Sequence, residues 1–342
     1  MNGKRDIAAG VLGALGITRA VQALGPSPAG SVAILAYHRV FDVPEEDAYP
    51  FDIELISASV DAFRRQMDYV ARHFRPITFA TLLAHLDRGE PPPPRALVVT
   101  FDDGFADNYH SAFPVLRERG IPATIFVSTG FIDRQENFWY ERVANAVLAS
   151  RSGRGELPGG EALVLGPDIA ARRPAVKRVL SALKQMPDDE RRRQVARLVA
   201  QFDPAGRCDG DPRSGPLTWD HVREMSAAGI EFGSHSVDHP ILSRVDDEGI
   251  RREFTESRAR IEAVTGRAVQ VVAYPVGGPD AFDGRVKAAA REAGYRLGIS
   301  YVTGYENTAT WDPFAIRRLH VERYTGEPLF RAMLAMPATF AG

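Results

Sequence analysis

Two adjacent carboxylates are the first residues of this sequence whose types and spacing could do chemistry. The segment "VVTFDDGFADNY" (98–109) places Asp102 and Asp103 directly after an apolar, β-branched run and before Gly104. Like charges this close raise each other's pKa and cost stability unless a cation or a reaction uses them. Asp-Gly is also common turn chemistry, so this segment alone leaves a turn and a site equally open.

A pair of histidines follows another apolar run. The segment "GSHSVDHP" carries His235 and His239 four residues apart. One carboxylate oxygen and two imidazoles form a ligand set that suits a divalent cation such as zinc. The histidine spacing is weak evidence alone, but two strand-end motifs can converge on one point. We predict that Asp103, His235 and His239 bind a divalent metal ion, expected to be Zn2+, and that Asp102 accepts a proton from the attacking water. The alternative is a polar helix start without a metal.

Seven β-like segments position these motifs. Several are nearly continuous apolar runs, as in parallel strands that are covered on both faces. Helical patterns that end in glycine separate many of them, which is the order of a β/α architecture. The sequence therefore predicts an α/β barrel with its reactive groups at the C-terminal ends of the strands. The segments are 32–38, 96–101, 123–128, 230–235, 269–275, 295–300 and 315–321.

One long segment departs from this order. Residues 135 to about 214 indicate a helical insertion between the third and fourth strands. Its mild excess of basic residues fits a solvated helical face, and a lid or a partner surface is the alternative. We predict an N-terminal helical segment over 1–30 and one domain over 31–342 that contains the insertion.

Composition narrows the class of protein. The chain has 342 residues, of which 44% are hydrophobic and 25% charged, as in a soluble globular enzyme. A net charge of −2 gives no indication of a nucleic-acid partner, and we expect none. The single cysteine, Cys208, excludes an internal disulfide framework.

The N-terminus leaves several locations open. Basic residues precede a short apolar stretch, which loosely resembles a signal peptide. The stretch between Asp6 and Arg19 has only 12 residues, whereas a membrane span needs about 20. We expect no cleaved signal and instead a helix that packs on the domain or lies on a membrane surface. The predicted location is cytoplasmic, with peripheral membrane association through this segment, and the alternative is periplasmic.

Three motifs together resemble one enzyme family. "TFDDG", "HSVDH" and "AYPVGG" are similar to motifs of the polysaccharide deacetylases, carbohydrate esterase family four, and "YHRV" resembles their exopolysaccharide-associated branch. The resemblance covers residues 31 to about 320 apart from the insertion. It implies a distorted (β/α)7-type barrel with a helical insertion. It also implies a metal-dependent hydrolase that removes acetyl groups from N-acetylated sugars of a polysaccharide or a lipid-linked glycan precursor.

The resemblance assigns roles to individual residues. Asp102 matches the general base, while Asp103, His235 and His239 match the metal ligands. In the third motif, the backbone amide of Val276 would help to hold the oxyanion.

Tyr274 and Pro275 of the third motif are predicted to contact the substrate. The motif departs from the family at Ala273, because an arginine that orients the catalytic aspartate usually stands there. Arg317 or Arg318 could replace it, and strand alternation lets only one of the two face inward.

Two more histidines have two interpretations each. His320 in "RRLHV" could be the general acid that protonates the leaving amine, or a surface histidine at a strand end. His38 could contact sugar hydroxyls or support the metal site, or could be a hydrogen-bonded core histidine. Large aromatics could stack on sugar rings, but each one taken singly favours a core position. These are Trp139, Tyr140, Trp219, Tyr301 and Trp311.

Two rival functions stay open at this stage. A catalytically impaired glycan-binding protein would follow from the missing arginine at position 273. A metallohydrolase that cleaves another carbon–nitrogen amide bond would use the same ligands.

Overall fold

The computed structural model of the chain describes residues 2–15, 30–203 and 215–340. Parts of two predicted segments therefore lie outside the described residues. These are 16–29 of the N-terminal segment and 204–214 of the insertion.

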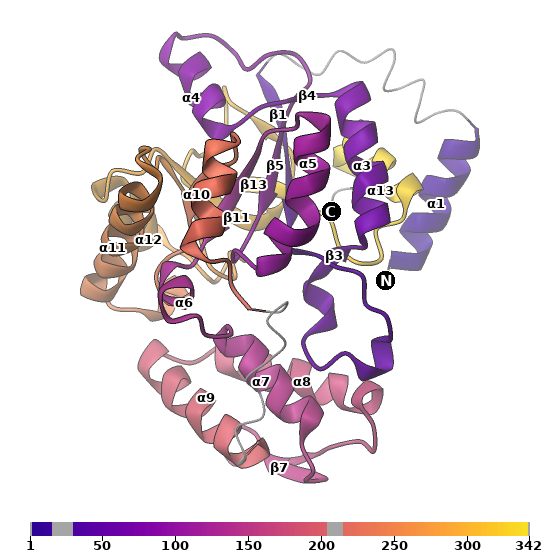
Figure 1. Ribbon diagram of the computed structural model, residues 1–342, viewed down its shortest axis with the longest axis vertical. Helices are drawn as coiled ribbons and strands as arrows, with labels where there is room; N and C mark the ends of the chain where they lie inside the picture. The colour runs from indigo at the N-terminus through magenta and orange to yellow at the C-terminus, as the bar shows by residue number, and fades with distance from the viewer. Residues whose placement is uncertain (1, 16–29, 204–214, 341–342) are drawn as a thin grey trace.

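Seven parallel strands close into a barrel, which confirms the predicted fold class (Figure 1). The strands follow one another around the ring in the order β1-β13-β11-β10-β9-β6-β5, and β5 pairs with β1 from Val32↔Ala96 to Tyr37↔Phe101. The barrel is irregular, because β9 and β10 pair only at Val272↔Ser234. Its strands are β1 (Ser31–Tyr37), β5 (Ala96–Phe101), β6 (Ala123–Val127), β9 (Glu231–Ser234), β10 (Val271–Ala273), β11 (Leu297–Thr303) and β13 (Ile316–His320).

Two apolar layers explain why the strands are continuous hydrophobic runs. Alternate residues of a strand point to opposite faces. In β1, Val32 and Ile34 belong to the cluster that fills the barrel, whereas Ala33 and Leu35 belong to the cluster under the helices. Both faces of each strand are therefore buried. The inward face of β5, formed by Ala96 and Val98, leads directly to the two aspartates that follow the strand.

Helices surround the barrel, and the predicted glycine stops are present at two of them. Ser59 caps one helix and Thr218 another, and Gly120 and Gly266 end theirs in left-handed conformations. The helices are α3 (Val60–His73), α4 (Phe79–Asp87), α5 (Phe113–Arg119), α6 (Thr129–Arg134), α10 (Trp219–Ala227), α11 (Asp247–Thr265), α12 (Gly284–Glu292), α13 (Glu327–Ala335) and α14 (Pro337–Phe340).

Short elements complete the barrel edges and the loops. Two short strands flank the barrel sheet, and two others pair above the end of β1. They are β4 (Arg75–Pro76), β12 (Glu306–Asn307), β2 (Arg39–Val40) and β3 (Ile56–Ala58). Four single turns of helix are Glu46–Ala48, Ile53–Leu55, Asn108–Ala112 and Leu242–Arg244.

The segment between β6 and β9 forms a lobe beside the barrel, visible at the bottom of Figure 1. It has a hydrophobic cluster of its own, to which α7, α8 and α9 all contribute. A two-stranded hairpin, not expected from the sequence, lies between its first two helices. The elements are α7 (Trp139–Ala149), β7 (Arg154–Glu156), β8 (Ala162–Val164), α8 (Ile169–Lys184) and α9 (Asp188–Phe202).

The N-terminal helix α1 (Asn2–Ala14) packs beside α13 on the outside of the barrel (Figure 1). Ala9 is fully buried there, and Leu12 packs against the core. Among the described residues, no helix is both long enough and apolar enough to span a membrane. The predicted division of the chain into domains stays a prediction.

Candidate active site

A cavity of about 350 Å3 opens where the C-terminal ends of the barrel strands meet the lobe. The loops after β1, β5, β9 and β10 form one wall, and helices α7 and α8 form the other. Its size is that of a small-ligand site. The end of the barrel is the one at which the sequence places the reactive groups.

Asp102 and Asp103 lie at the bottom of this cavity and are almost fully buried. The Asp102 N–H still donates to the Tyr37 carbonyl oxygen at 2.9 Å, as a continuation of the sheet. Asp103 then adopts a φ of 72°, and Gly104 a φ of 81°. A Cβ on Gly104 would lie 2.8 Å from Val127 Cγ1, so glycine is required for the sharp turn that exposes both carboxylates to the cavity.

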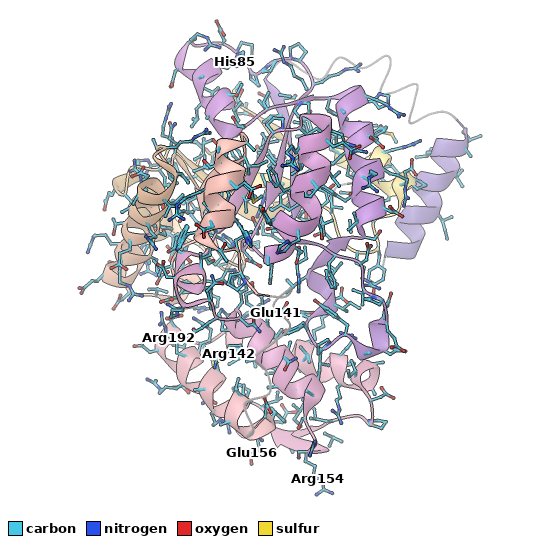
Figure 2. The ribbon with its side chains drawn as sticks, viewed as in Figure 1. His85, Glu141, Arg142, Arg154, Glu156 and Arg192 are labelled. Carbon is cyan, nitrogen blue, oxygen red and sulfur yellow. The ribbon has the colours of Figure 1, made fainter. Side chains whose placement is uncertain are left out.

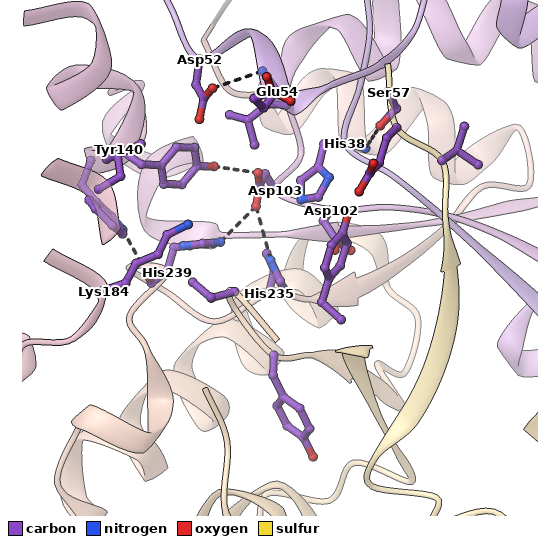
Figure 3. Close-up of a pocket in the computed structure, with 18 residues that line it drawn as sticks. His38, Asp52, Glu54, Ser57, Asp102, Asp103, Tyr140, Lys184, His235 and His239 are labelled. Carbon is purple, nitrogen blue, oxygen red and sulfur yellow. Dashed lines mark hydrogen bonds and ion pairs between the residues drawn. The ribbon is translucent and has the colours of Figure 1, made fainter. Parts of the chain in front are cut away.

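Asp103, His235 and His239 converge on one point (Figure 3). The Nε2 atoms of His235 and His239 lie 3.3 and 3.1 Å from the same oxygen, Asp103 Oδ1. That oxygen is buried and has no hydrogen-bond partner among the described residues. One candidate ligand atom from each residue lies within 4.8 Å of the other two. This donor set fits a divalent cation.

The orientation of His235 is set by a backbone contact. Its Nδ1 lies 2.8 Å from the Ala273 carbonyl oxygen. A carbonyl oxygen can only accept a hydrogen bond, so Nδ1 carries a proton. In a neutral His235 this leaves Nε2, which lies beside Asp103, free to ligate a metal ion. Ala273 therefore supports the site through its backbone.

Arg318 takes the position of the arginine that is missing at Ala273. Its Nη1 donates to Asp102 Oδ1 at 2.8 Å and its Nη2 to Asp102 Oδ2 at 2.6 Å. Burial raises the pKa of Asp102, but the charge and hydrogen bonds of Arg318 outweigh it and lower that pKa below its usual range. Arg317 points outward and pairs with Glu306 at 2.9 Å. Of the two predicted candidates, Arg318 is thus the one that holds Asp102.

Burial also raises the pKa of Asp103, and the neighbouring imidazoles of His235 and His239 reverse this effect. The pKa of Asp103 is well below its usual range as a result. Both aspartates are therefore ionised at neutral pH, one against an arginine and one against two imidazoles.

The lobe contributes two aromatic residues to the site. The Tyr140 hydroxyl donates to Asp103 Oδ2 at 2.7 Å, and Trp139 Nε1 donates to the His239 carbonyl oxygen at 3.1 Å (Figure 3). Trp219 and Trp311, which the sequence offered as stacking residues, do not line the cavity, whereas Tyr301 does.

Strained backbone gathers at the same place. Six non-glycine residues with positive φ occur in the described residues, and four of them lie in the site loops. The four are Asp103, Ser236, His239 and Val276. Their conformations cost energy that the surrounding hydrogen bonds must offset, and three of the four, Asp103, His239 and Val276, line the cavity.

The "AYPVGG" segment places its three predicted residues differently. Val276 lines the cavity, and within the described part of the chain no backbone carbonyl accepts its N–H. Tyr274 also lines the cavity, but its ring stacks on Phe282 and its hydroxyl donates to the Phe314 carbonyl oxygen at 3.1 Å, so the hydroxyl is used in the core. Pro275 does not line the cavity.

Of the two remaining candidate histidines, one lines the cavity and the other does not. His38 lines the cavity, and the Ser57 hydroxyl accepts its backbone N–H at 2.9 Å. His320 does not line it and instead stacks on Tyr301 with ring centroids 3.7 Å apart. Burial, with the neighbouring charge of Arg318, lowers the pKa of His320 to about 3.

Sequence reasoning missed several polar residues of the cavity wall, among them Asp52, Glu54 and Lys184. Asp52 and Glu54 lie in the loop before β3, and Lys184 ends α8. None belongs to a motif or follows a barrel strand. No signal in the sequence could have found them, because only the tertiary structure brings this loop and the end of α8 together at the site.

The fold and this site define a (β/α)7-barrel hydrolase with an Asp/His/His centre. The family model for polysaccharide deacetylase matches residues 89–298, which is more than half of the chain. The chain belongs to the polysaccharide deacetylase family, whose members remove acetyl groups from glycans.

Two curated relatives share low sequence identity with this chain. YxkH of Bacillus subtilis (strain 168) is 20% identical over 219 residues, which cover 64% of this chain and 49% of YxkH. The poly-beta-1,6-N-acetyl-D-glucosamine N-deacetylase of Escherichia coli (strain K12) is 27% identical over 99 residues, which cover 29% of this chain and 14% of that protein. The chain thus spans about half the length of the first relative and far less of the second.

A solved structure shares the fold over most of the chain. It is that of the Streptococcus pyogenes deacetylase PplD in complex with acetate. The two proteins are 18% identical, with a TM-score of 0.59, and the match covers 93% of this chain and 100% of PplD.

Proposed function

We propose that this protein is a metal-dependent deacetylase that hydrolyses the acetamido group of N-acetylated sugars in a polysaccharide or a lipid-linked glycan. The observation that carries the proposal is the paired arrangement of the two aspartates. Asp103 lies against two histidines that share one of its oxygens, and Asp102 lies against Arg318. The poly-N-acetylglucosamine deacetylase among the relatives supports this substrate class.

Asp103, His235 and His239 would hold the cation, and this mixed oxygen and nitrogen donor set suits Zn2+. When bound, a divalent cation would polarise the acetyl carbonyl and make the attacking water more acidic. Tyr140 fixes the second oxygen of Asp103, and the Ala273 carbonyl fixes the tautomer of His235. These contacts keep the three ligand atoms aimed at one point.

The other residues divide the remaining steps of amide hydrolysis. Asp102, kept ionised by Arg318, accepts a proton from the water while the water oxygen forms a bond to the acetyl carbon. The Val276 N–H is available to donate to the oxyanion that forms. The carbon–nitrogen bond then breaks, acetate leaves, and the amine takes up a proton.

We assign the donation of that last proton to His38 and not to His320. The side chain of His38 lines the cavity beside the aspartates (Figure 3). A pKa of about 3 keeps His320 neutral at physiological pH, and its Nε2 is buried outside the cavity. A general acid must be protonated and within reach of the leaving group.

The rival functions differ in what they predict. The impaired-enzyme alternative arose from Ala273, and the Arg318–Asp102 pair supplies the contact whose absence motivated it. The amide-hydrolase alternative differs only in the leaving acyl group, so substrate profiling separates it.

Acetate release tests the proposal. We expect the purified, metal-replete protein to release acetate from N-acetylglucosamine oligomers, and a chelator to abolish this release. Asp103→Ala should lose the metal, and Asp102→Asn should keep it but lower kcat by about 100-fold or more. Asp133→Asn, an exposed carboxylate outside the cavity, is the control. Release that persists in chelator or in Asp103→Ala would disprove the mechanism.

A further inference from the structure

A cation from the lobe points into the active-site cavity. Lys184 is the last residue of α8, and it lines the cavity beside His239 and Tyr140 (Figure 3). It is not a motif residue, and the mechanism above does not use it. Its position depends on the lobe, so it belongs to the part of this chain that lies outside the barrel.

Lys184 has no protein partner in this cavity. Within the described ranges, no carboxylate oxygen lies within ion-pair distance, 4.0 Å, of its Nζ. Asp52 and Glu54 line the same cavity, and the Glu54 N–H donates to Asp52 Oδ1 at 3.1 Å. Of the other carboxylates that line the cavity, Asp102 faces Arg318 and Asp103 faces the two histidines. Glu322, just after β13, is the third, and none of the three forms an ion pair with Lys184.

A partly buried ammonium group without a partner is costly to keep. Burial lowers the pKa of Lys184, and the nearby charges of Asp52 and Asp103 only partly oppose this. An anion that entered the cavity would give the ammonium group the hydrogen bonds it lacks. A neutral sugar offers only hydroxyl and amide groups, for which an uncharged donor would serve as well.

We infer that the acetylated sugar taken by this site carries an acidic substituent, a carboxylate or a phosphate, that Lys184 binds. This inference rests on the proposed function and narrows its substrate class. The acetamido group reaches the aspartates at the bottom of the cavity, while the acidic group lies against the lobe wall. The lobe, by supplying Lys184, then acts as a specificity element.

Three sugars that differ at one carbon test this inference. N-Acetylglucosamine, N-acetylglucosaminuronic acid and N-acetylglucosamine 6-phosphate differ only at C6, as a hydroxymethyl group, a carboxylate and a phosphate ester. We measure kcat/KM for acetate release from each with wild type and Lys184→Met at fixed ionic strength. Wild type should prefer at least one acidic sugar, and the variant should lose about tenfold or more on that sugar. Release from the neutral sugar should change less than twofold.

Two further variants make the result specific. Lys184→Arg retains the charge and should restore part of the preference. Arg178→Met removes a cation from the same helix, where Arg178 pairs with Glu161 on the exposed side, and should change none of the three rates. Circular dichroism and thermal unfolding establish that each variant is folded.

The outcomes separate this inference from the proposed function. An equal loss on neutral and acidic sugars would show a catalytic role for Lys184, and no loss on acidic sugars would show no role; either result overturns the inference. A wild type that prefers the neutral sugar also overturns it. If wild type releases acetate from none of the sugars, the proposed function fails. Calorimetric binding of the same three sugars then still tests Lys184, since tighter binding of an acidic sugar must be lost in Lys184→Met.

Discussion

Arg318 makes the contact to Asp102 that is expected from an arginine at position 273. Ala273, where the arginine is missing, lies on β10, and Arg318 lies two strands away on β13. The side chains of Ala273 and Ile316 both belong to the cluster inside the barrel. Arg318 is two residues after Ile316, so its side chain points to the same interior face. A long guanidinium side chain can therefore reach Asp102 from either strand.

Removal of Arg318 should disable the catalytic base. Arg318→Met leaves the buried Asp102 carboxylate unpaired, which should lower the free energy of unfolding by about 3–5 kcal/mol. It should also lower kcat by about 100-fold or more, because the base is no longer oriented or held ionised. Denaturant unfolding and acetate-release kinetics measure the two effects.

The neighbouring residue provides the matched control. Arg317→Met removes an arginine from the same strand whose side chain is half exposed and pairs with Glu306. It should leave kcat unchanged. The double variant Asp102→Asn with Arg318→Met removes both charges and should recover stability but not activity. Loss of activity in Arg317→Met equal to that in Arg318→Met would contradict this assignment.

At the scale of elements, the start of α7 joins the lobe to the site through three successive residues. Trp139 holds the His239 carbonyl, Tyr140 holds Asp103, and Glu141 accepts the Asp52 N–H at 3.2 Å. Successive helical residues point about 100° apart. The first turn of α7 therefore contacts three loops at once, and Glu141 lies at the junction of lobe and barrel (Figure 2).

Glu141 should make the stability of this junction depend on pH. Burial is the main cause that raises the pKa of Glu141 to about 8, although Arg39 lies 3.7 Å away. The folded state therefore binds more protons than the unfolded state between about pH 4.5 and 8. The contribution of Glu141 to the free energy of unfolding is greatest below this pH window. It falls by up to about 1.4 kcal/mol per pH unit as the pH rises through the window.

Denaturant unfolding of wild type and of Glu141→Gln at pH 5.5 and 8.5 measures how much of the pH-dependent change in the free energy of unfolding comes from Glu141. Glu141→Gln keeps the shape and the hydrogen-bonding capacity but does not titrate. Wild type should lose more stability than this variant between the two pH values. Glu136→Gln, an exposed carboxylate just before α7, should behave as wild type. Parallel pH profiles for wild type and Glu141→Gln would contradict the assignment.

At the scale of the whole molecule, α1 carries an apolar stripe away from the barrel. Three of the five large hydrophobic side chains exposed in the described ranges are Ile7, Val11 and Leu15, at spacings of four residues. The opposite face of the helix packs on the core through Ala9 and Leu12. Since the sequence adds basic residues at positions 4 and 5, we propose that this stripe binds an anionic membrane surface.

Vesicle sedimentation tests this proposal on the intact chain. Wild type should sediment with vesicles that contain phosphatidylglycerol, and the double variant Ile7→Ser with Val11→Ser should bind at least tenfold more weakly because it loses buried apolar area. Val164→Ser, an exposed apolar residue on the hairpin, is the control and should bind as wild type. Equal binding by all three proteins would rule out the stripe as the contact.

Local patterns were enough for the barrel and for the central motifs. The seven strands were visible because each is apolar on both faces, and each reactive motif directly follows one of them. The sequence predicted that four side chains lie close together, because the parallel strands they follow end at the same edge of the barrel. They are Asp102, Asp103, His235 and His239. The glycines that end helices, such as Gly120 and Gly266, act within one turn and were visible for the same reason.

The sequence by itself determined which carboxylates and imidazoles meet at the end of the barrel, because their spacing from the strand ends is local. Only the tertiary structure decided which of Arg317 and Arg318 reaches Asp102, and which of His38 and His320 lines the cavity. It also brought Tyr140 and Lys184 from the lobe to the site. These contacts join residues far apart in the chain, and they depend on how the barrel closes and how the lobe docks, which no spacing along the sequence encodes.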